Sequence, residues 1–327
     1  MLDPIKRAWR EWQRRAGAAR STRERSAMLR AKGFRAEDAL IVTGDPRGGT
    51  TWLAETLCAW PGTAMNWEPL HHQLGMVPEA MHWGRRPFIP ESDTDPERIA
   101  LMRDLLSGKR TNEWTLRYCS TEHAVGAERL LTKFVRANLL LPWMTARITF
   151  ARKPILLLRH PVPTVLSQLK AFPNAEHRAA AFRVPDQLFN ERFIAHADYL
   201  SSLPPGLERS LALWCLNNQA TLRHPRHGSD WLVVHYEDLL HDPITSLERI
   251  GEAWRVDPAP WIDHVRINRS SATDFHQERL SDPSAQATKW MQRIDASQAV
   301  RLQSILDHFG IQEYRVESAT PSGAHPG

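Results

Sequence analysis

The feature that most constrains the fold is a glycine-rich loop directly after a short apolar run. The run is residues 39–42, and the loop at residues 43–52 reads Thr-Gly-Asp-Pro-Arg-Gly-Gly-Thr-Thr-Trp. Gly44 and Gly49 have the spacing of a Walker A loop, but Thr50 stands where a nucleotide triphosphatase has lysine. The N–H groups of such a loop, and of the helix predicted to begin near Thr50, form a cradle for phosphate. We therefore predict a phosphate site after a buried strand, for a ligand other than ATP.

A second motif follows another apolar run, at residues 153–158. This run leads through Arg159 and two prolines to Ser167. Prolines suit a strand-to-helix turn and a first helical turn, because neither needs their missing N–H. Arg159 is thus expected at the carboxyl end of a strand, the edge where ligands bind in open parallel sheets, with Ser167 about two turns into the next helix. A guanidinium and a hydroxyl that converge there can bind a second phosphate. Two phosphate sites on one sheet describe a nucleotide phosphorylated at both ends of its ribose.

Five short apolar runs have the length of buried strands, and helical stretches separate most of them. This alternation is typical of a parallel sheet that helices cover on both faces. We predict a single α/β domain of three layers around a central, mostly parallel sheet of about five strands. A final amphipathic helix is predicted near residues 294–309. The predicted strands are residues 39–43, 63–67, 130–135, 154–159 and 231–236.

At this point the chain resembles the P-loop sulfotransferase family, which uses 3'-phosphoadenosine 5'-phosphosulfate (PAPS). Residues 45–52 are similar to that family's loop for the 5'-phosphosulfate, and residues 159–167 to its 3'-phosphate motif. A third stretch, residues 235–243, is similar to the family's Tyr-Glu-Asp-Leu segment after a late strand. Order and spacing agree across roughly residues 38–312. The resemblance implies sulfuryl transfer from PAPS to a hydroxyl, leaving adenosine 3',5'-bisphosphate (PAP), with no metal.

The resemblance also implies roles for the loop residues. Many cytosolic members have lysine where this chain has Arg47, so the role carries over as a cation; arginine chelates two oxygens well but donates a proton poorly. Trp52 is expected to stack on adenine, although a core position is the alternative. The remaining loop contacts to the 5'-phosphate are expected from Gly48, Gly49, Thr50 and Thr51, where the two threonines can also act only as helix caps.

Sulfuryl transfer to a hydroxyl needs a base near the acceptor oxygen and cations near the leaving phosphate. Glu68 follows the second predicted strand, and Pro69 fixes the turn after it, so we predict Glu68 as the base; members that sulfate carbohydrates are similar in using a Glu there. The alternative is an ordinary ion-pairing Glu. Small-molecule members use a histidine where this chain has Val135, which disfavours a histidine base. The nearby pair His71-His72 remains a second possibility.

Two lysines complete the predicted site. A charge inside the apolar run 130–135 must point toward a partner or the site, so Lys133 is a candidate contact to the transferred sulfuryl group. Lys289 stands at the end of a polar, irregular segment, residues 268–290, that we predict to be a lid. It is a candidate contact to the 3'-phosphate, with a surface lysine as the alternative. Residues 71–128 are predicted to hold the acceptor-binding helices and loops.

Charge is distributed unevenly along the chain. The formal net charge is +5, and residues 1–35 alone carry eleven Lys or Arg against three Asp or Glu. We predict residues 1–36 as a basic helical extension, with Trp9 and Trp12 packed on the main domain; contact with an anionic membrane surface is the alternative. The sulfotransferase-like domain is predicted over residues 37–315, and a disordered tail over residues 316–327.

The remaining composition indicates a cytoplasmic protein. No apolar run approaches the roughly 18–20 residues of a membrane-spanning helix, and the N-terminus has no signal-peptide core. Three scattered cysteines indicate a reducing compartment and are expected to be buried or inert: Cys58, Cys119 and Cys215. The expected partner is a hydroxyl-bearing acceptor, preferably a carbohydrate or glycoconjugate, with no nucleic acid. A non-catalytic nucleotide-binding protein and a P-loop kinase are the alternatives.

Overall fold

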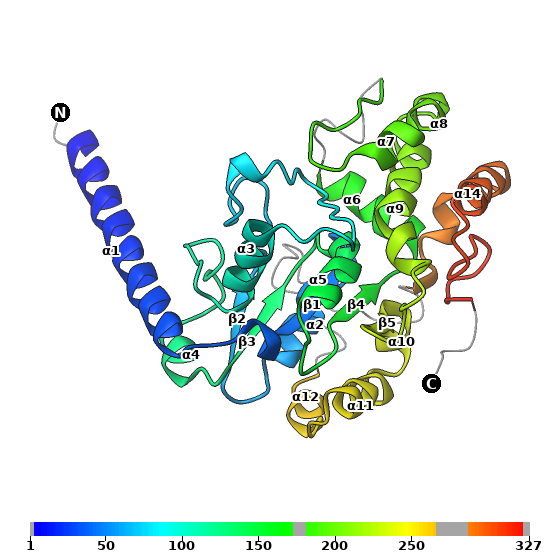
Figure 1. The fold of residues 1–327 in the computed structure, drawn as a ribbon. Coiled ribbons are helices and arrows are strands. Elements are labelled where there is room, and N and C mark those ends of the chain that lie inside the picture. The colour runs from blue at the N-terminus through cyan, green and yellow to red at the C-terminus, as the bar shows by residue number, and fades with distance from the viewer. Residues whose placement is uncertain (1–2, 173–180, 266–286, 323–327) are drawn as a thin grey trace.

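The sheet is the centre of the molecule (Figure 1). The computed structural model describes residues 3–172, 181–265 and 287–322, and for residues 3–16 only the helical backbone. Five parallel strands pair in the order β2-β3-β1-β4-β5. They are β1 (Leu40–Gly44), β2 (Thr63–Trp67), β3 (Arg129–Lys133), β4 (Ile155–Leu158) and β5 (Leu232–His235). Each overlaps a predicted strand, so the predicted parallel α/β sheet is confirmed.

Alternation along the strands explains why helices cover both faces. Successive strand side chains point to opposite faces, and here both faces are apolar. Leu40 and Val42 of β1 belong to one buried cluster, whereas Ile41 between them belongs to another. The cluster of Leu40 and Val42 includes α2 (Thr50–Leu57), α11 (Pro243–Trp254) and α12 (Ala259–His264). The cluster of Ile41 includes α3 (Pro96–Leu106), α5 (Leu141–Arg147), α6 (Pro161–Ala171), α9 (Leu207–Leu222) and α14 (Ala296–His308). The three predicted layers are therefore present.

The strand order sets the positions of the two predicted phosphate motifs. β1 lies in the middle of the sheet, with β3 on one side and β4 on the other. Val42 pairs with Lys133 of β3, and Gly44 pairs with Leu157 of β4. The loop after β1 therefore lies between the end of β3, which carries Lys133, and the end of β4, which leads to Arg159.

Local sequence fixes where α6 begins after β4. His160 is the N-cap residue, and its Nδ1 accepts a hydrogen bond from the N–H of Val162 at 3.2 Å. Pro161 is the first residue of the helix, where a missing N–H costs nothing. The start that the prolines predict is confirmed, and it carries Ser167 on the second turn.

Helix α1 (Asp3–Ala31) extends away from the domain at its N-terminal end (Figure 1), while its C-terminal end packs against α4 (Thr121–Gly126). Leu29 is fully buried in a cluster with Leu116 and Leu130. Arg25 donates to the carbonyl oxygens of Leu116 and Cys119 at 2.8 and 2.6 Å. The last turns of α1 thus pack on the domain, and the boundary at residue 36 stays a prediction. The packing of Trp9 and Trp12 stays a prediction, since their side chains lie outside the described part.

Several other predictions about the chain can be compared with the structure. Val316, the first residue of the predicted tail, is buried at 3% exposure, and the tail itself stays a prediction. The three cysteines are free, and burial raises the pKa of Cys119 to about 11.

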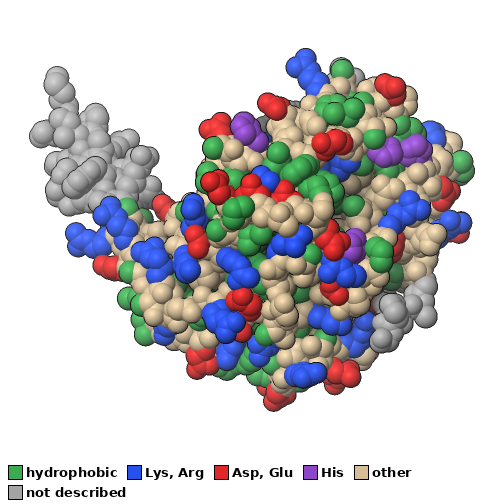
Figure 2. Space-filling view, viewed as in Figure 1, with side chains coloured by type: hydrophobic (Ala, Val, Ile, Leu, Met, Phe, Trp, Pro, Cys, Tyr) green, Lys and Arg blue, Asp and Glu red, His purple; other side chains and the backbone are tan. Residues whose placement is uncertain are grey.

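Basic and acidic side chains are interspersed over the face of the domain that Figure 2 shows. Over the described ranges, none of the helices combines the length and apolarity needed to cross a membrane. The remaining short helices are η1 (Ala36–Asp38), η2 (Glu79–Met81), η3 (Asn138–Leu140), α7 (Glu191–Ala195), α8 (Ala197–Ser202), α10 (Tyr236–His241) and η4 (Met291–Arg293).

Candidate active site

The loop after β1 is held in a conformation that only glycine tolerates well at one position. Gly49, the N-cap residue of α2, has φ 93°, in the left-handed region. A Cβ atom there would lie 2.5 Å from Cδ2 of the Tyr236 ring. Arg47 also has a positive φ, 66°, which turns the backbone of the loop at that residue. The loop therefore packs directly on Tyr236, and its backbone approaches more closely than a side chain would allow.

The two predicted phosphate motifs are in direct contact. Arg47 Nε donates to Ser167 Oγ at 3.1 Å, and Arg159 Nη1 donates to the Arg47 carbonyl oxygen at 2.8 Å. Gln168 on α6 adds a third link, since its Nε2 donates to the Pro46 carbonyl oxygen at 2.8 Å. The structure thus brings together Arg47 from the loop after β1, Arg159 after β4 and Ser167 on α6.

The segment after β5 packs against Arg159 and the start of α6. The guanidinium carbon of Arg159 lies 4.7 Å from the centre of the Tyr236 ring. Glu237 Oε1 accepts the backbone N–H of His160 at 2.8 Å, and its Oε2 accepts the hydroxyl of Tyr314 at 3.1 Å. The segment that resembles the family's third motif therefore braces Arg159 and the start of α6.

A buried polar network around Asp45 escaped the sequence analysis. Asp45 is 5% exposed, and its Oδ2 accepts hydrogen bonds from Asn218 Nδ2 at 2.8 Å and Asn138 Nδ2 at 3.3 Å. Arg86 Nη1 lies 3.2 Å from Asp45 Oδ1. Burial raises the pKa of Asp45, and the charge of Arg86 opposes that effect. This network ties the phosphate loop to α9 and to the predicted acceptor-binding segment.

Glu68 and Lys133 form the second part of the site. Lys133 Nζ donates to Glu68 Oε1 at 2.5 Å, and Arg136 Nη1 lies 3.5 Å from Glu68 Oε2. Lys133 is 2% exposed, and burial lowers its pKa while Glu68 opposes that effect. Lys133 Nζ also lies 3.9 Å from the centre of the Trp67 ring. The expectation that Lys133 needs a partner is confirmed, and the partner is Glu68.

The backbone of Glu68 is in an unusual conformation. Its φ is 40°, which costs a residue with a Cβ about 1 to 3 kcal/mol and persists only where surrounding contacts hold it. Here the Glu68 N–H donates to the Lys133 carbonyl oxygen at 2.8 Å, and Trp114 Nε1 donates to the Glu68 carbonyl oxygen at 3.3 Å. These contacts aim the carboxylate at the end of β3, beside the centre of the sheet.

The geometry of His71 does not suit a base. Its Nδ1 accepts the N–H groups of Gln73 and Leu74, at 3.3 and 3.1 Å. The neutral ring then carries its proton on Nε2, so neither nitrogen is free to accept one. Burial, followed by the charge of Arg136, lowers the pKa of His71 to about 4.

The other predicted nucleotide contacts lie near the loop. Thr50 and Thr51 are the first residues of α2 and are buried, whereas Trp52 is partly exposed and packs against the cluster that includes α2. Lys289 is exposed, and the neighbouring Trp290 is buried, with its ring 4.4 Å from that of His160. Trp290 thus places Lys289 close to the motif of Arg159.

Two predictions lie partly beyond what can be described. Most of the predicted lid, residues 268–290, falls in the range 266–286 outside the described residues. Within residues 3–172, 181–265 and 287–322, no group of three or more His, Cys, Asp or Glu side chains is placed to hold a metal ion. That the reaction needs no metal stays a prediction.

Solved structures similar to this chain are sulfotransferases of low sequence identity. The mouse sulfotransferase SULT7A1 complexed with PAP is 14% identical over 89% of this chain and 90% of its own, with a TM-score of 0.44. The sulfotransferase domain of the Synechococcus PCC 7002 olefin synthase is 18% identical over 84% of this chain and 94% of its own, with a TM-score of 0.42. A sulfotransferase from Alicyclobacillus acidocaldarius is 14% identical over 83% of this chain and 96% of its own, with a TM-score of 0.34. No curated protein matches the chain significantly.

The sequence itself matches a family model. The model described as "Sulfotransferase family" matches residues 39–261, from the residue before β1 into α12. This range is more than half of the chain, and it holds the phosphate loop, the Arg159 motif, Glu68 and Lys133. The chain therefore belongs to the sulfotransferase family and is a sulfotransferase.

Proposed function

We propose that this sulfotransferase moves the sulfuryl group of PAPS to a hydroxyl of a carbohydrate or glycoconjugate, with Glu68 as the general base. The observation that carries the proposal is the Glu68 carboxylate at the end of β2, paired with Lys133 at 2.5 Å beside the phosphate loop. A paired carboxylate only accepts hydrogen bonds, which is the state that a base needs before it takes a proton.

The donor nucleotide fits the residues that converge at the centre of the sheet. Arg47, the N–H groups of Gly48 to Thr51 and the N-terminus of α2 would hold the 5'-phosphosulfate. Arg159 and Ser167, which the structure brings to Arg47, would hold the 3'-phosphate, with Lys289 beside them. PAPS would supply an activated sulfur bonded to a good leaving group. Trp52 on the first turn of α2 remains the candidate for adenine.

Residues of this chain can take the proton of the acceptor hydroxyl and offset the charge that develops on the leaving phosphate. Glu68 takes the proton of the acceptor hydroxyl as the hydroxyl oxygen bonds to sulfur and the bond from sulfur to the 5'-phosphate oxygen breaks. Arg47 offsets the charge that develops on the leaving phosphate. Lys133 holds Glu68 in place, and its lowered pKa makes it a better proton donor to the leaving group than Arg47.

The acceptor preference rests on the type of base and on the neighbouring segment. Glu68 stands where family members that sulfate carbohydrates use a Glu, and residues 71–128 beside it mix aromatic and charged side chains. The rings of Trp114 and His71 lie 4.7 Å apart at an interplanar angle of 58°, close to Glu68, and aromatic rings of this kind suit the apolar faces of sugars. A cytoplasmic location and a peripheral contact of α1 with membranes remain part of the proposal.

Substitution of Glu68 tests the mechanism. Glu68→Gln keeps the shape but removes the base, so turnover with PAPS is expected to fall about 100-fold or more, while PAP affinity stays within a few-fold. The control is Glu79→Gln, because Glu79 is an exposed Glu of η2. Sulfation kinetics measure the turnover number, and titration with PAP measures its dissociation constant. If Glu68→Gln turns over as fast as Glu79→Gln, Glu68 is not the base.

A further inference from the structure

A group of arginines lies on the side of Glu68 where β2 and β3 end. Arg136 follows β3, and its only acceptor among the described residues is Glu68 Oε2 at 3.5 Å. Arg86 Nη1 donates to the carbonyl oxygen of Val135, the residue before Arg136, at 2.9 Å. Arg192 of α7 in turn donates to the Arg86 carbonyl oxygen at 2.7 Å. We call Arg86, Arg136 and Arg192 the arginine cluster: Arg136 contacts the proposed base, and the other two are linked to it through backbone carbonyls.

The arginine cluster carries more positive charge than its protein partners offset. Lys133 and Arg136 share the single carboxylate of Glu68, and Arg86 pairs with Asp45. Arg192 donates to two backbone carbonyls and lies over the rings of Phe88 and Phe193, and its buried Nε has no acceptor among the described residues. Glu191, the acidic neighbour of Arg192, is exposed on α7.

The cluster is also partly removed from water. The side chain of Arg136 is 15% exposed and that of Arg86 is 22% exposed. Burial, followed by the charge of Arg86, lowers the pKa of Arg136 to about 10. Like charges this close and this buried are costly unless an anion joins them. The cost rises during the reaction, because Glu68 becomes neutral when it takes the acceptor's proton.

The sheet order separates this cluster from the nucleotide's 3'-phosphate site. Arg159 and Ser167 follow β4, on one side of β1, whereas Glu68 and Arg136 follow β2 and β3, on the other. An anion at the arginine cluster therefore belongs with the acceptor hydroxyl that Glu68 deprotonates.

We propose that the acceptor is itself an anion, a hydroxyl compound with a carboxylate, phosphate or sulfate near the hydroxyl, and that Arg136 and Arg86 bind this group. The proposal rests on the proposed function, because it places the acceptor beside Glu68. Guanidinium groups bind such oxyanions through two parallel hydrogen bonds, which neutral sugars cannot match. Arg192 positions Arg86 by holding its backbone.

Binding of matched sugars to the full chain saturated with PAP tests the proposal. The probes are methyl glucoside, methyl glucuronide and glucose 6-phosphate, titrated by calorimetry. The two anionic sugars are expected to bind about tenfold or more tightly than the neutral one, the scale of a charge-assisted hydrogen bond. Comparison of the carboxylate with the phosphate shows which oxyanion fits better.

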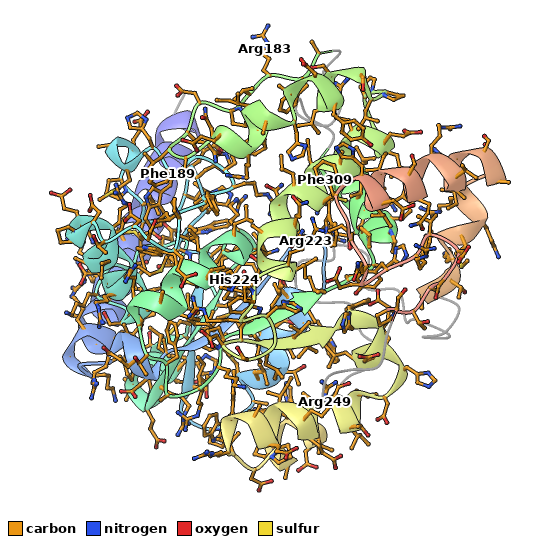
Figure 3. All side chains as sticks on the ribbon, turned by 45° about the vertical axis from the view of Figure 1, so that its right-hand side comes forward. Arg183, Phe189, Arg223, His224, Arg249 and Phe309 are labelled. Atoms are coloured by element: carbon orange, nitrogen blue, oxygen red, sulfur yellow. The ribbon has the colours of Figure 1, made fainter. Side chains whose placement is uncertain are left out.

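Two variants decide whether the arginine cluster causes the preference. Arg136→Gln should weaken binding of the anionic sugars about tenfold while changing that of methyl glucoside much less. Arg183→Gln is the matched control, because Arg183 lies exposed before α7 and points outward from the domain (Figure 3). Equal binding of all three sugars, or a preference that survives in Arg136→Gln, overturns the proposal. A chain that fails to bind PAP contradicts the proposed function instead, so the two failures are distinct.

Discussion

At the scale of single residues, His160 shows how the ends of β4 and the C-terminal segment constrain each other. It is fully buried, its Nδ1 accepts from the Val162 N–H, and its Nε2 lies 3.1 Å from the Arg315 carbonyl oxygen, to which it donates. Both contacts need the neutral ring with the proton on Nε2. Burial therefore lowers the pKa of His160 to about 4, from an ordinary value of 6.5.

This depressed pKa predicts a loss of stability in mild acid. Between about pH 4 and 6.5 the unfolded chain binds a proton that the folded His160 does not, so the free energy of unfolding falls as the pH falls through that window. His160→Gln is expected to remove a contribution of about 2 to 3 kcal/mol to the difference between pH 7.5 and pH 4.5. Urea unfolding at both pH values measures it. His123→Gln, an exposed histidine of α4, is the control, and an unchanged pH dependence in His160→Gln would contradict the assignment.

At the scale of elements, the phosphate loop depends on its close contact with the segment after β5. Gly49→Ala forces a Cβ into a left-handed residue and against the Tyr236 ring. The loop must then shift, and we expect the free energy of unfolding to drop by about 1 to 3 kcal/mol. PAP affinity, measured by titration, is expected to fall about tenfold or more because the N–H cradle is displaced.

The control for this prediction is another glycine next to a helix end. A Cβ on Gly126, the last residue of α4, meets nothing within 4 Å, so Gly126→Ala should leave both stability and PAP affinity unchanged. Equal PAP affinity in Gly49→Ala and Gly126→Ala would show that the loop does not bind the nucleotide through its backbone.

Elements and site residues differ in how far the sequence predicts them. The strands and the start of α6 are predictable because apolar runs, turns and prolines act within a few residues. Glu68 and Lys133 are predictable as strand-end residues, since parallel strands bring their carboxyl ends to one edge. The Asp45 network is not, because Asn218 is 173 residues from Asp45 and nothing local to either residue marks the contact. Arg86 and Arg136 are visible in the sequence as charges near the predicted site. Only tertiary packing shows that Arg86 donates to the carbonyl oxygen of the residue before Arg136.

At the scale of the whole molecule, the site is built from both halves of the sheet and from a segment beyond the range of the family model. That model ends at residue 261, yet the Trp290 ring packs against His160 and Tyr314 donates to Glu237, which holds the start of α6. The C-terminal segment thus supports the proposed 3'-phosphate motif, while the opposite half of the sheet carries Glu68 and the arginine cluster. A nucleotide bound at the centre would contact elements from most of the chain and should stabilise the fold as a unit.

This arrangement predicts which nucleotides stabilise the protein. A ligand that binds only the folded state, at a concentration of 100 times its dissociation constant, raises the free energy of unfolding by about 2.7 kcal/mol. PAP should do so, adenosine 5'-monophosphate should do so less because it lacks the 3'-phosphate, and ATP with Mg²⁺ should do so least because Thr50 replaces the lysine of a Walker A loop. Thermal unfolding at matched ligand concentrations measures the order. Arg159→Lys keeps the charge but loses the planar fork, so it should narrow the gap between PAP and the monophosphate. If ATP with Mg²⁺ stabilises the protein and PAP does not, that result contradicts the two-phosphate site.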